Sequence, residues 1–296
     1  MKINGIYPEK CILCGECINE CPPGLFSREK SHGKGGVVYN NPLDRCIRCG
    51  HCIAVCKPGA INYEAEETAF TFENIDHPEK IVPFDSIFKF LAIRRSVRRF
   101  KDKPVDREDL EAVFKAMQYA PSASNARRWQ YIAVTDRQKI AWLSAKTLDL
   151  FKMMRSLINL RWLLWPFLPG NIKKMIFSPS MKGVINEAIA EYKKGKDFIF
   201  FHAPCILILH APVYGSSISG NDAGIALTYG MLAAQSRGLG SCWIGFAQEA
   251  IERKPEVQRW LSLPKQHKVY GVLALGYPDV KYFFIPPRSE LEVRYM

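Results

Sequence analysis

The feature that most constrains this chain is a cysteine repeat near its start. The segment CILCGECINECPPG, residues 11–24, recurs 35 positions later as CIRCGHCIAVCKPG, residues 46–59. Each copy has the spacing C-x2-C-x2-C-x3-C, and the cysteines are Cys11, Cys14, Cys17 and Cys21, then Cys46, Cys49, Cys52 and Cys56. An internal repeat therefore holds eight of the chain's ten cysteines within its first 56 residues.

This spacing predicts iron–sulfur clusters. A C-x2-C-x2-C loop supplies three thiolates to one [4Fe-4S] cluster, and in the bacterial motif the fourth cysteine binds the other cluster. We predict one cluster on Cys11, Cys14, Cys17 and Cys56 and a second on Cys46, Cys49, Cys52 and Cys21. Structural zinc also uses C-x2-C pairs, but two complete matching sets do not resemble its two separated pairs. His51 is predicted to be a solvent-facing spacer, because all eight ligand positions are filled.

Residues 1–64 resemble the two-[4Fe-4S] bacterial-type ferredoxins, including the ending GAINYE. Two departures are visible. Lys57 separates the last cysteine from Pro58, and the insert FSREKSHGKGGVVYNNPLDR, residues 26–45, lengthens the middle. Neither departure removes a predicted ligand.

Composition narrows the remaining choices. With 296 residues, 48% hydrophobic, the chain is long enough for a large globular domain beside the small one. It begins without an apolar signal segment, so we expect reduced, metal-bound cysteines and a cytoplasmic location. The net charge of +12 comes from basic residues spread along the chain, which does not indicate a nucleic-acid partner.

One aromatic stretch, LINLRWLLWPFLPGNIKKMIF at residues 157–177, is too interrupted to span a membrane. Its tryptophans beside lysines would suit contact with a membrane surface. We favour a lid or a subunit interface, which such exposed apolar residues also indicate.

Strand and helix patterns interleave after residue 85. Residues 65–85 are acidic, contain two prolines and are predicted to be a linker. The expected helices are residues 86–96 (after Asp85), 110–120 and 222–238, and the expected strands are residues 129–135, 205–211, 241–246 and 269–276. This mixture predicts an α/β or α+β domain over residues 86–296.

Three stretches of that domain are suited to binding an anionic, planar ligand. RRSVRRF, residues 94–100, offers guanidinium groups that pair with phosphate. APSASNARRW, residues 120–129, is a loop of small residues, and Arg288 adds a late cation. Taken singly, the arginine-rich stretch could be a solvated helix end and the loop of small residues only a turn.

Their order resembles the FMN-dependent nitroreductase family over residues 86–296, with NDAGIALTYGMLAAQSRGLGSCWIGF and LALGYP as further matching blocks. The resemblance implies an α+β, three-layer flavin fold and a homodimer that binds FMN at its subunit interface. The implied FMN-binding residues are Arg94, Arg95, Ser96, Arg98, Ser122, Ser124, Asn125, Ile244, Gly245 and Arg288. Among them Arg94, Ser96 and Arg288 are implied at the phosphate, Arg98 and Asn125 at the isoalloxazine edge, and the backbone near Ile244 and Gly245 at flavin N5.

The chain departs from this family in two places. Arg127 and Arg128 stand where the family often has Gln-Pro, and the inserted segment at about 145–200 is longer and more aromatic than a minimal member needs. Cys205 and Cys242 are predicted to be buried packing residues, and Asp222 a helix cap or interface residue.

The two resemblances together predict an oxidoreductase in which clusters relay electrons to FMN, which reduces a nitroaromatic, quinone or conjugated carbonyl. The expected donor is a low-potential carrier such as ferredoxin. NAD(P)H stays open as a direct donor, although no G-x-G-x-x-G dinucleotide motif is present. The alternatives are an electron-transfer adaptor for a protein partner, or a reductive dehalogenase-like or flavin-converting relative. No catalytic side chain is assigned, because the cofactor performs the transfer.

Overall fold

The computed structural model describes residues 1–29, 35–164, 166, 179–213 and 218–296. The chain divides into two compact units. Unit 1 comprises Met1–Phe84 with Ser122–Arg127, and unit 2 comprises Asp85–Pro121 with Arg128–Met296. Each unit is described separately below.

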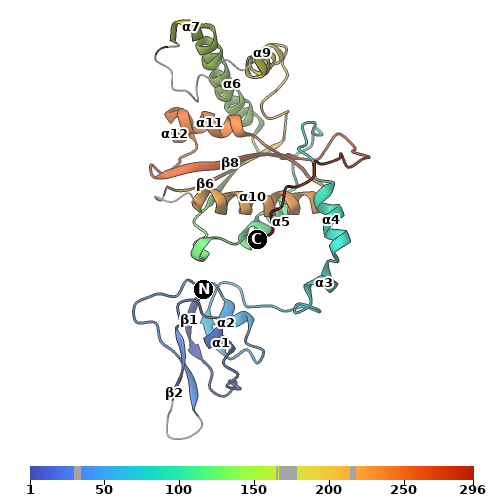
Figure 1. Ribbon diagram of the computed structural model, residues 1–296. Helices are drawn as coiled ribbons and strands as arrows, with labels where there is room; N and C mark the ends of the chain where they lie inside the picture. Colours follow the sequence, from blue (N-terminus) through green and yellow to red (C-terminus); the bar gives the residue numbers. More distant parts are fainter. Residues whose placement is uncertain (30–34, 165, 167–178, 214–217) are drawn as a thin grey trace. The chain divides into compact units, whose positions relative to one another are not determined.

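Unit 1 is a small domain of short elements (Figure 1). They are β1 Lys2–Ile6, α1 Glu16–Asn19, β2 Phe26–Glu29, β3 Gly36–Tyr39, α2 His51–Ala54, β4 Ile61–Glu64, α3 Pro78–Ile81 and the 3-10 helix η1 Ala123–Asn125. β1 pairs with β4 and β2 with β3, both antiparallel. The hairpin β2–β3 is formed by the insert that lengthens the middle of the repeat.

The repeat in the sequence is also a repeat in the backbone. α1 and α2 are each preceded by a glycine in the left-handed conformation, Gly15 at φ 87° and Gly50 at φ 78°. Glycine adopts positive φ without steric cost, so both copies turn sharply after their second cysteine. The third cysteine of each copy then lies on the short helix and is buried, as Cys17 and Cys52.

Unit 2 contains one sheet and most of the helices (Figure 1). Its elements are α4 Phe84–Ala92, α5 Arg107–Gln118, β5 Gln130–Val134, α6 Arg137–Asn159, α7 Arg161–Leu164, α9 Pro179–Lys193, β6 Cys205–Pro212, α10 Ile218–Ser236, β7 Gly240–Trp243, α11 Gly245–Arg253, α12 Pro255–Trp260 and β8 His267–Gly276. The strand order is β5-β6-β8-β7, and every pairing is antiparallel.

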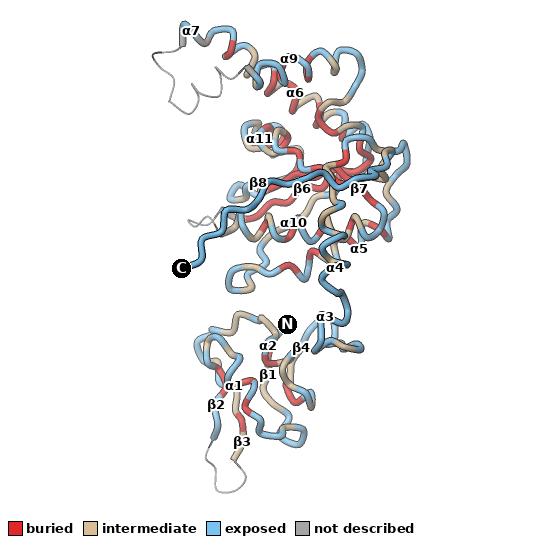
Figure 2. Tube along the Cα trace, turned by 45° about the vertical axis from the view of Figure 1, so that its right-hand side comes forward, coloured by how far each residue is buried: buried red, intermediate tan, exposed pale blue. Residues whose placement is uncertain are grey.

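Helices cover both faces of this sheet, which confirms the three-layer α+β architecture. α5 and α10 lie on one face, and α6, α9, α11 and α12 lie on the other. On β6, Leu207 and Leu209 belong to the core with α5 and α10, whereas Ile206 and Ile208 belong to the core with α6 and α11. A strand buried on both faces reads as a continuous apolar run, and Figure 2 shows β6 and β8 buried along most of their length.

Several boundaries differ from the predictions, and α4 ends at Ala92 rather than at residue 96. β7 ends at Trp243 rather than at residue 246, because Gly245 already begins α11. α10 begins at Ile218, which places Asp222 inside the helix and not at its cap. Asp85 lies in the first turn of α4 rather than before it.

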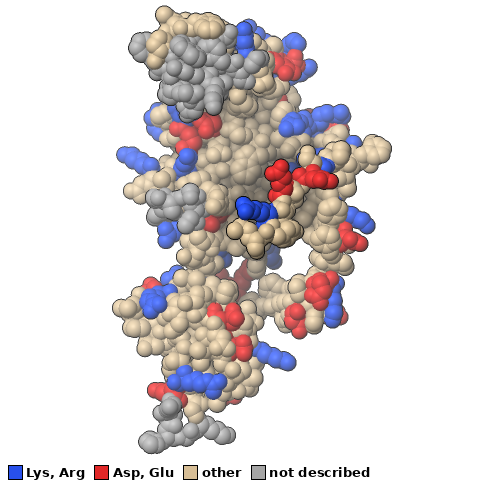
Figure 3. Space-filling model, in the orientation of Figure 1, with Lys and Arg blue, Asp and Glu red and all other residues tan. Residues whose placement is uncertain are grey.

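The aromatic stretch at 157–177 is only partly covered, since residues 165 and 167–178 lie outside the described part of the chain. The helices in the described ranges include none with the length and apolarity needed to cross a bilayer. On the face shown in Figure 3, basic and acidic side chains are interspersed, so the net charge of +12 is not gathered there into one basic surface.

Candidate metal centres and cofactor site

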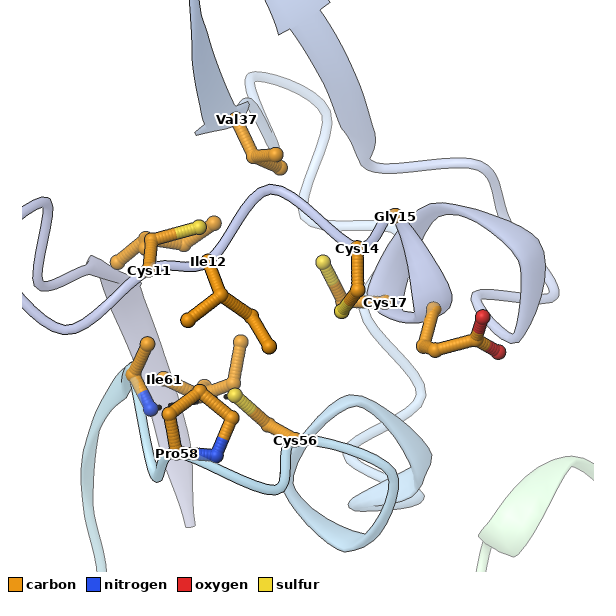
Figure 4. Close-up of a pocket in the computed structure, with 12 residues that line it drawn as sticks. Cys11, Ile12, Cys14, Gly15, Cys17, Val37, Cys56, Pro58 and Ile61 are labelled. Atoms are coloured by element: carbon orange, nitrogen blue, oxygen red, sulfur yellow. Dashed lines mark hydrogen bonds between the residues drawn. The ribbon is translucent and has the colours of Figure 1, made fainter.

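Two cavities in unit 1 are lined by four cysteines each. The first has a volume of about 330 Å³, and its cysteines are Cys11, Cys14, Cys17 and Cys56, which Figure 4 shows directed toward a common space. The second has a volume of about 340 Å³, and its cysteines are Cys21, Cys46, Cys49 and Cys52. The last cysteine of each copy therefore lines the cavity of the other copy, which is the arrangement that cross-ligation of two clusters requires.

Each cavity is lined by four thiols, the number that one [4Fe-4S] cluster takes. Within the described ranges, no group of three or more cysteine, histidine, aspartate or glutamate side chains is placed to hold one metal ion. Four thiolates on zinc would each lie about 2.3 Å from a common centre. Thiols arranged around an open cavity instead fit a polynuclear iron–sulfur cluster, whose four iron corners each take one thiolate.

Backbone and burial both act on these sulfur atoms. The N–H of Leu25 donates to Cys21 Sγ at 3.3 Å, and the N–H of Ala60 donates to Cys56 Sγ at 3.1 Å. Burial, with a contribution from neighbouring thiols, raises the pKa of Cys17, and it raises that of Cys52 to about 11. These thiols are protonated without metal, so iron must displace their protons when a cluster is assembled.

In unit 2, the arginine-rich segment at 94–98 lies against strand β7. The N–H of Val97 donates to the carbonyl of Ser241 at 3.0 Å, and Ser96 forms a parallel bridge with Ser241. Gly240 makes this approach possible, because a Cβ there would lie 2.6 Å from Val97 Cγ2. The fold thus joins two of the predicted blocks that are far apart in sequence.

Cations surround the start of β7. Arg94, Ser96 and Arg98 act on the buried thiol of Cys242, whose pKa burial raises and these three groups partly lower again. Arg95 donates from Nη2 to the carbonyl of Ala92 at 2.6 Å, while its Nε is buried and has no partner among the described atoms. A buried donor without an acceptor is costly, so this Nε fits a missing anionic group such as a phosphate.

The turn between β7 and α11 contains both positions predicted at flavin N5. The N–H of Ile244 donates to the carbonyl of Val272 at 2.8 Å and so belongs to the sheet. Gly245 is the first residue of α11, where N–H groups have no acceptor within the helix. Of the two positions predicted at flavin N5, Gly245 is the one whose N–H the sheet does not use.

The remaining predicted residues are Arg288, Ser122, Ser124 and Asn125. Arg288 lies in the exposed segment after β8, and no hydrogen bond or ion pair within the described ranges joins it to residues 94–98. Ser122, Ser124 and Asn125 belong to unit 1, where Asn125 Nδ2 donates to the carbonyls of Ile47 at 3.1 Å and Arg48 at 2.8 Å. Their flavin contacts stay predictions.

The place of some residues in these sites was not predicted from the sequence. Cys205 and Cys242 are buried as predicted, with 0% and 3% exposed, but the position of Cys242 beside the arginines was not anticipated. Tyr39, which lines the second cysteine cavity, was likewise missed. Each position depends on pairing between distant strands or segments, for which a single sequence carries no local signal.

The sites define a two-part redox protein, with a module of two four-cysteine cavities and a three-layer α+β domain that has a cation-lined site. The chain belongs to the nitroreductase family, whose profile matches residues 91–277, and residues 10–69 match the 4Fe-4S dicluster domain. This confirms both resemblances seen in the sequence.

Individual relatives agree with that assignment. A putative NADH dehydrogenase/NAD(P)H nitroreductase of Archaeoglobus fulgidus is 26% identical over 201 residues, which is 68% of this chain and 90% of the relative. An iodotyrosine deiodinase of Thermotoga neapolitana is 26% identical over 213 residues, covering 68% and 93%. The crystal structure of a nitroreductase with bound FMN from Bacteroides fragilis is 25% identical, with a TM-score of 0.50, and the match covers 70% of this chain and 98% of that one. The protein is therefore a nitroreductase-like oxidoreductase.

Proposed function

We propose that this chain accepts electrons singly at its N-terminal unit and uses FMN in its second unit to reduce a small organic molecule. A nitroaromatic, a quinone or a conjugated carbonyl would be a suitable acceptor. The observation that carries this proposal is the presence of two four-cysteine cavities in the same chain as a nitroreductase domain. When bound, [4Fe-4S] clusters would supply one-electron steps, and FMN would couple them to two-electron chemistry.

The cysteines of unit 1 would hold the two clusters, one cluster in each cavity. Cys11, Cys14, Cys17 and Cys56 would bind the first, and Cys46, Cys49, Cys52 and Cys21 the second. Because each set draws one ligand from the other copy, the two sites would support each other's geometry. The backbone N–H groups that reach Cys21 and Cys56 would hold those sulfurs in place.

The segment at 94–98 and the start of α11 would hold FMN. Arg94, Arg95 and Ser96 would bind its phosphate, with the buried Nε of Arg95 finding there the acceptor that the chain does not provide. The N–H of Gly245 would face the ring near N5. Arg98, Ile244, Ser122, Ser124, Asn125 and Arg288 complete the proposed set.

The proposed working form is a homodimer. α4 has no buried residue although it is strongly apolar, with Leu91 47% exposed (Figure 2). An exposed apolar surface of this kind favours cover by a second chain. A low-potential carrier such as ferredoxin is the proposed donor, with NAD(P)H as the alternative, and the cytoplasmic location stays a prediction.

The proposal is tested on protein purified without oxygen. We expect about eight irons and about eight sulfides per chain, together with one FMN, and we expect the flavin absorbance to bleach after the clusters are reduced. A matched variant that lacks clusters but keeps FMN should not bleach with the same protein donor. Zinc in place of iron, or reduced clusters that never bleach the flavin, would contradict the proposal. Reduction of the flavin without turnover of any small acceptor would favour the electron-transfer adaptor.

Reductive dehalogenation is a second candidate, favoured by the similarity to the iodotyrosine deiodinase of Thermotoga neapolitana. The two candidates differ in the bond that is broken, since dehalogenation releases halide from a carbon. Parallel assays with a halotyrosine and a nitroaromatic, using the same reduced protein, would separate them. Halide release without nitro reduction would select the second candidate.

A further inference from the structure

The internal repeat allows the two cysteine cavities of unit 1 to be compared position by position. A shift of 35 residues carries the lining residues Ile12, Gly15 and Glu16 of the first cavity onto Ile47, Gly50 and His51 of the second. The backbone donors match as well, because Leu25 to Cys21 and Ala60 to Cys56 are equivalent hydrogen bonds. Differences between the two sites must therefore come mainly from side chains.

The side chains differ at three places. Glu16 of the first cavity corresponds to His51 of the second, so an anion is replaced by a neutral or cationic ring. Arg48 lines the second cavity, where its counterpart in the first copy is Leu13. Strand β3 gives Val37 to the first cavity and Tyr39 to the second. All three differences make the second cavity more favourable for negative charge.

Tyr39 is the most effective of these residues. Val37 and Tyr39 are two positions apart on β3 and so face the same side of the hairpin, one over each cavity. Tyr39 lines the second cavity together with the ligand Cys46, and its ring packs on Phe26 with centroids 5.0 Å apart. Glu16, Arg48 and His51 are exposed, and water and salt weaken their effect.

Two further features were weighed. Arg28 donates to the carbonyl of Leu13 at 3.2 Å beside the first cavity, but Arg45 donates to the carbonyl of Pro23 at 3.0 Å beside the second, so these cations balance. Cys14 is exposed whereas Cys49 is partly buried, and solvent near Cys14 favours negative charge at the first site. A hydroxyl group that lines the cavity among all four ligand sulfurs outweighs the greater exposure of one ligand in four.

We propose that Tyr39 makes the cluster held by Cys21, Cys46, Cys49 and Cys52 the easier of the two to reduce. Reduction adds one negative charge to a cluster, and a hydroxyl donor on a ligand sulfur stabilises the more negative state. The inference rests on the proposed function only in requiring that both cavities hold [4Fe-4S] clusters. It makes Tyr39 a tuning residue rather than a catalytic one.

The test is an anaerobic potentiometric titration of the full-length holoprotein, followed by electron paramagnetic resonance. Tyr39→Phe should lower the higher of the two midpoint potentials by about 59 mV, which for one electron is a tenfold change in the reduction equilibrium. The lower midpoint should not move. Tyr63→Phe is the matched control, since the Tyr63 hydroxyl accepts from Ala69 N at 2.8 Å and lines neither cavity. Glu16→Gln should raise only the lower midpoint, which assigns that wave to the first cavity.

The outcomes separate this inference from the proposed function. If Tyr39→Phe shifted the lower midpoint, or shifted neither midpoint, the role of Tyr39 would be overturned. Should that variant lose iron, Tyr39→Met keeps an apolar side chain against Phe26 and must give the same downward shift. The measurement reads only the cluster signals and needs no electron transfer to FMN or to an acceptor, so failure to reduce FMN would overturn the proposed function alone. A wild-type chain without cluster signals would overturn both.

Discussion

Substitution of Gly240 by alanine should separate the arginine-rich segment from strand β7. The added Cβ would lie 2.6 Å from Val97 Cγ2, 2.8 Å from Val97 Cβ and 3.0 Å from Pro278 Cγ. Val97 is 5% exposed and its N–H is bonded to Ser241, so it has little room to move. Overpacking of this kind costs about 1–3 kcal/mol. For a domain of this size, each kcal/mol lowers the melting temperature by about 2–4 °C.

The same displacement should weaken FMN binding, because it moves Arg94, Arg95 and Ser96 together. The assay measures FMN content and affinity by fluorescence beside the melting temperature of the same preparation. Gly183→Ala is the control, since nothing lies within 4 Å of a Cβ at Gly183; it should leave FMN affinity unchanged and should not lower the melting temperature, because alanine favours the helix α9 more than glycine does. Adding Val97→Ala to Gly240→Ala should restore part of the loss, because it removes the closest methyl. A Gly240→Ala variant with wild-type FMN affinity would refute the assignment of this segment to the phosphate.

Three other perturbations test separate parts of the structure. Burial lowers the pKa of His210, so the neutral ring is favoured in the folded state. Stability should therefore fall as the pH drops below the unfolded pKa of about 6.5. Unfolding midpoints from pH 8 to 5.5 should show this loss, and His210→Gln should make the midpoint depend less on pH. The hydroxyl of Tyr277 lies 2.7 Å from Asp109 Oδ2, and Tyr277→Phe should cost about 1–2 kcal/mol, seen as a lower urea midpoint at unchanged m-value. Replacing both Cys21 and Cys46 by serine should cost one cluster, because both line the second cavity. Replacing both Cys21 and one cysteine of the first cavity by serine should cost two clusters. Cross-ligation would be contradicted if the first variant lost both clusters and the second lost one, as ligation within each copy of the repeat would require.

Regular patterns in the sequence were sufficient for most of the architecture. The apolar run at 205–211 predicted a strand, and β6 is buried on both faces because helices cover the sheet on each side. The boundary of β7 was wrong because WIGF continues the apolar pattern of the strand into α11. Periodicity alone does not distinguish the end of a buried strand from the first turn of a buried helix.

The sites were predictable to different depths for a physical reason. The cysteine cavities depend on spacing within a short repeat, and local turns such as that at Gly15 build them from neighbouring residues. The cation-lined site depends on Ser96 meeting Ser241 across 145 positions, and only the folded chain brings them together. The sequence therefore indicated which residues bear charge, while their common target required the structure.

With the proposed clusters bound, the departures between the two copies of the repeat would give electron flow a direction. Two identical cysteine loops would give two sites of equal potential, between which an electron has no preferred position. Both copies have the cysteines and glycines that shape the cavities. They differ at the equivalent positions Glu16 and His51, and β3 contributes Val37 to one cavity and Tyr39 to the other. The insert that carries β3 is thus more than a spacer, because it provides the side chain that differs most in its effect on charge. Removing that difference should leave both cavities able to bind iron, yet make the two sites more alike in potential.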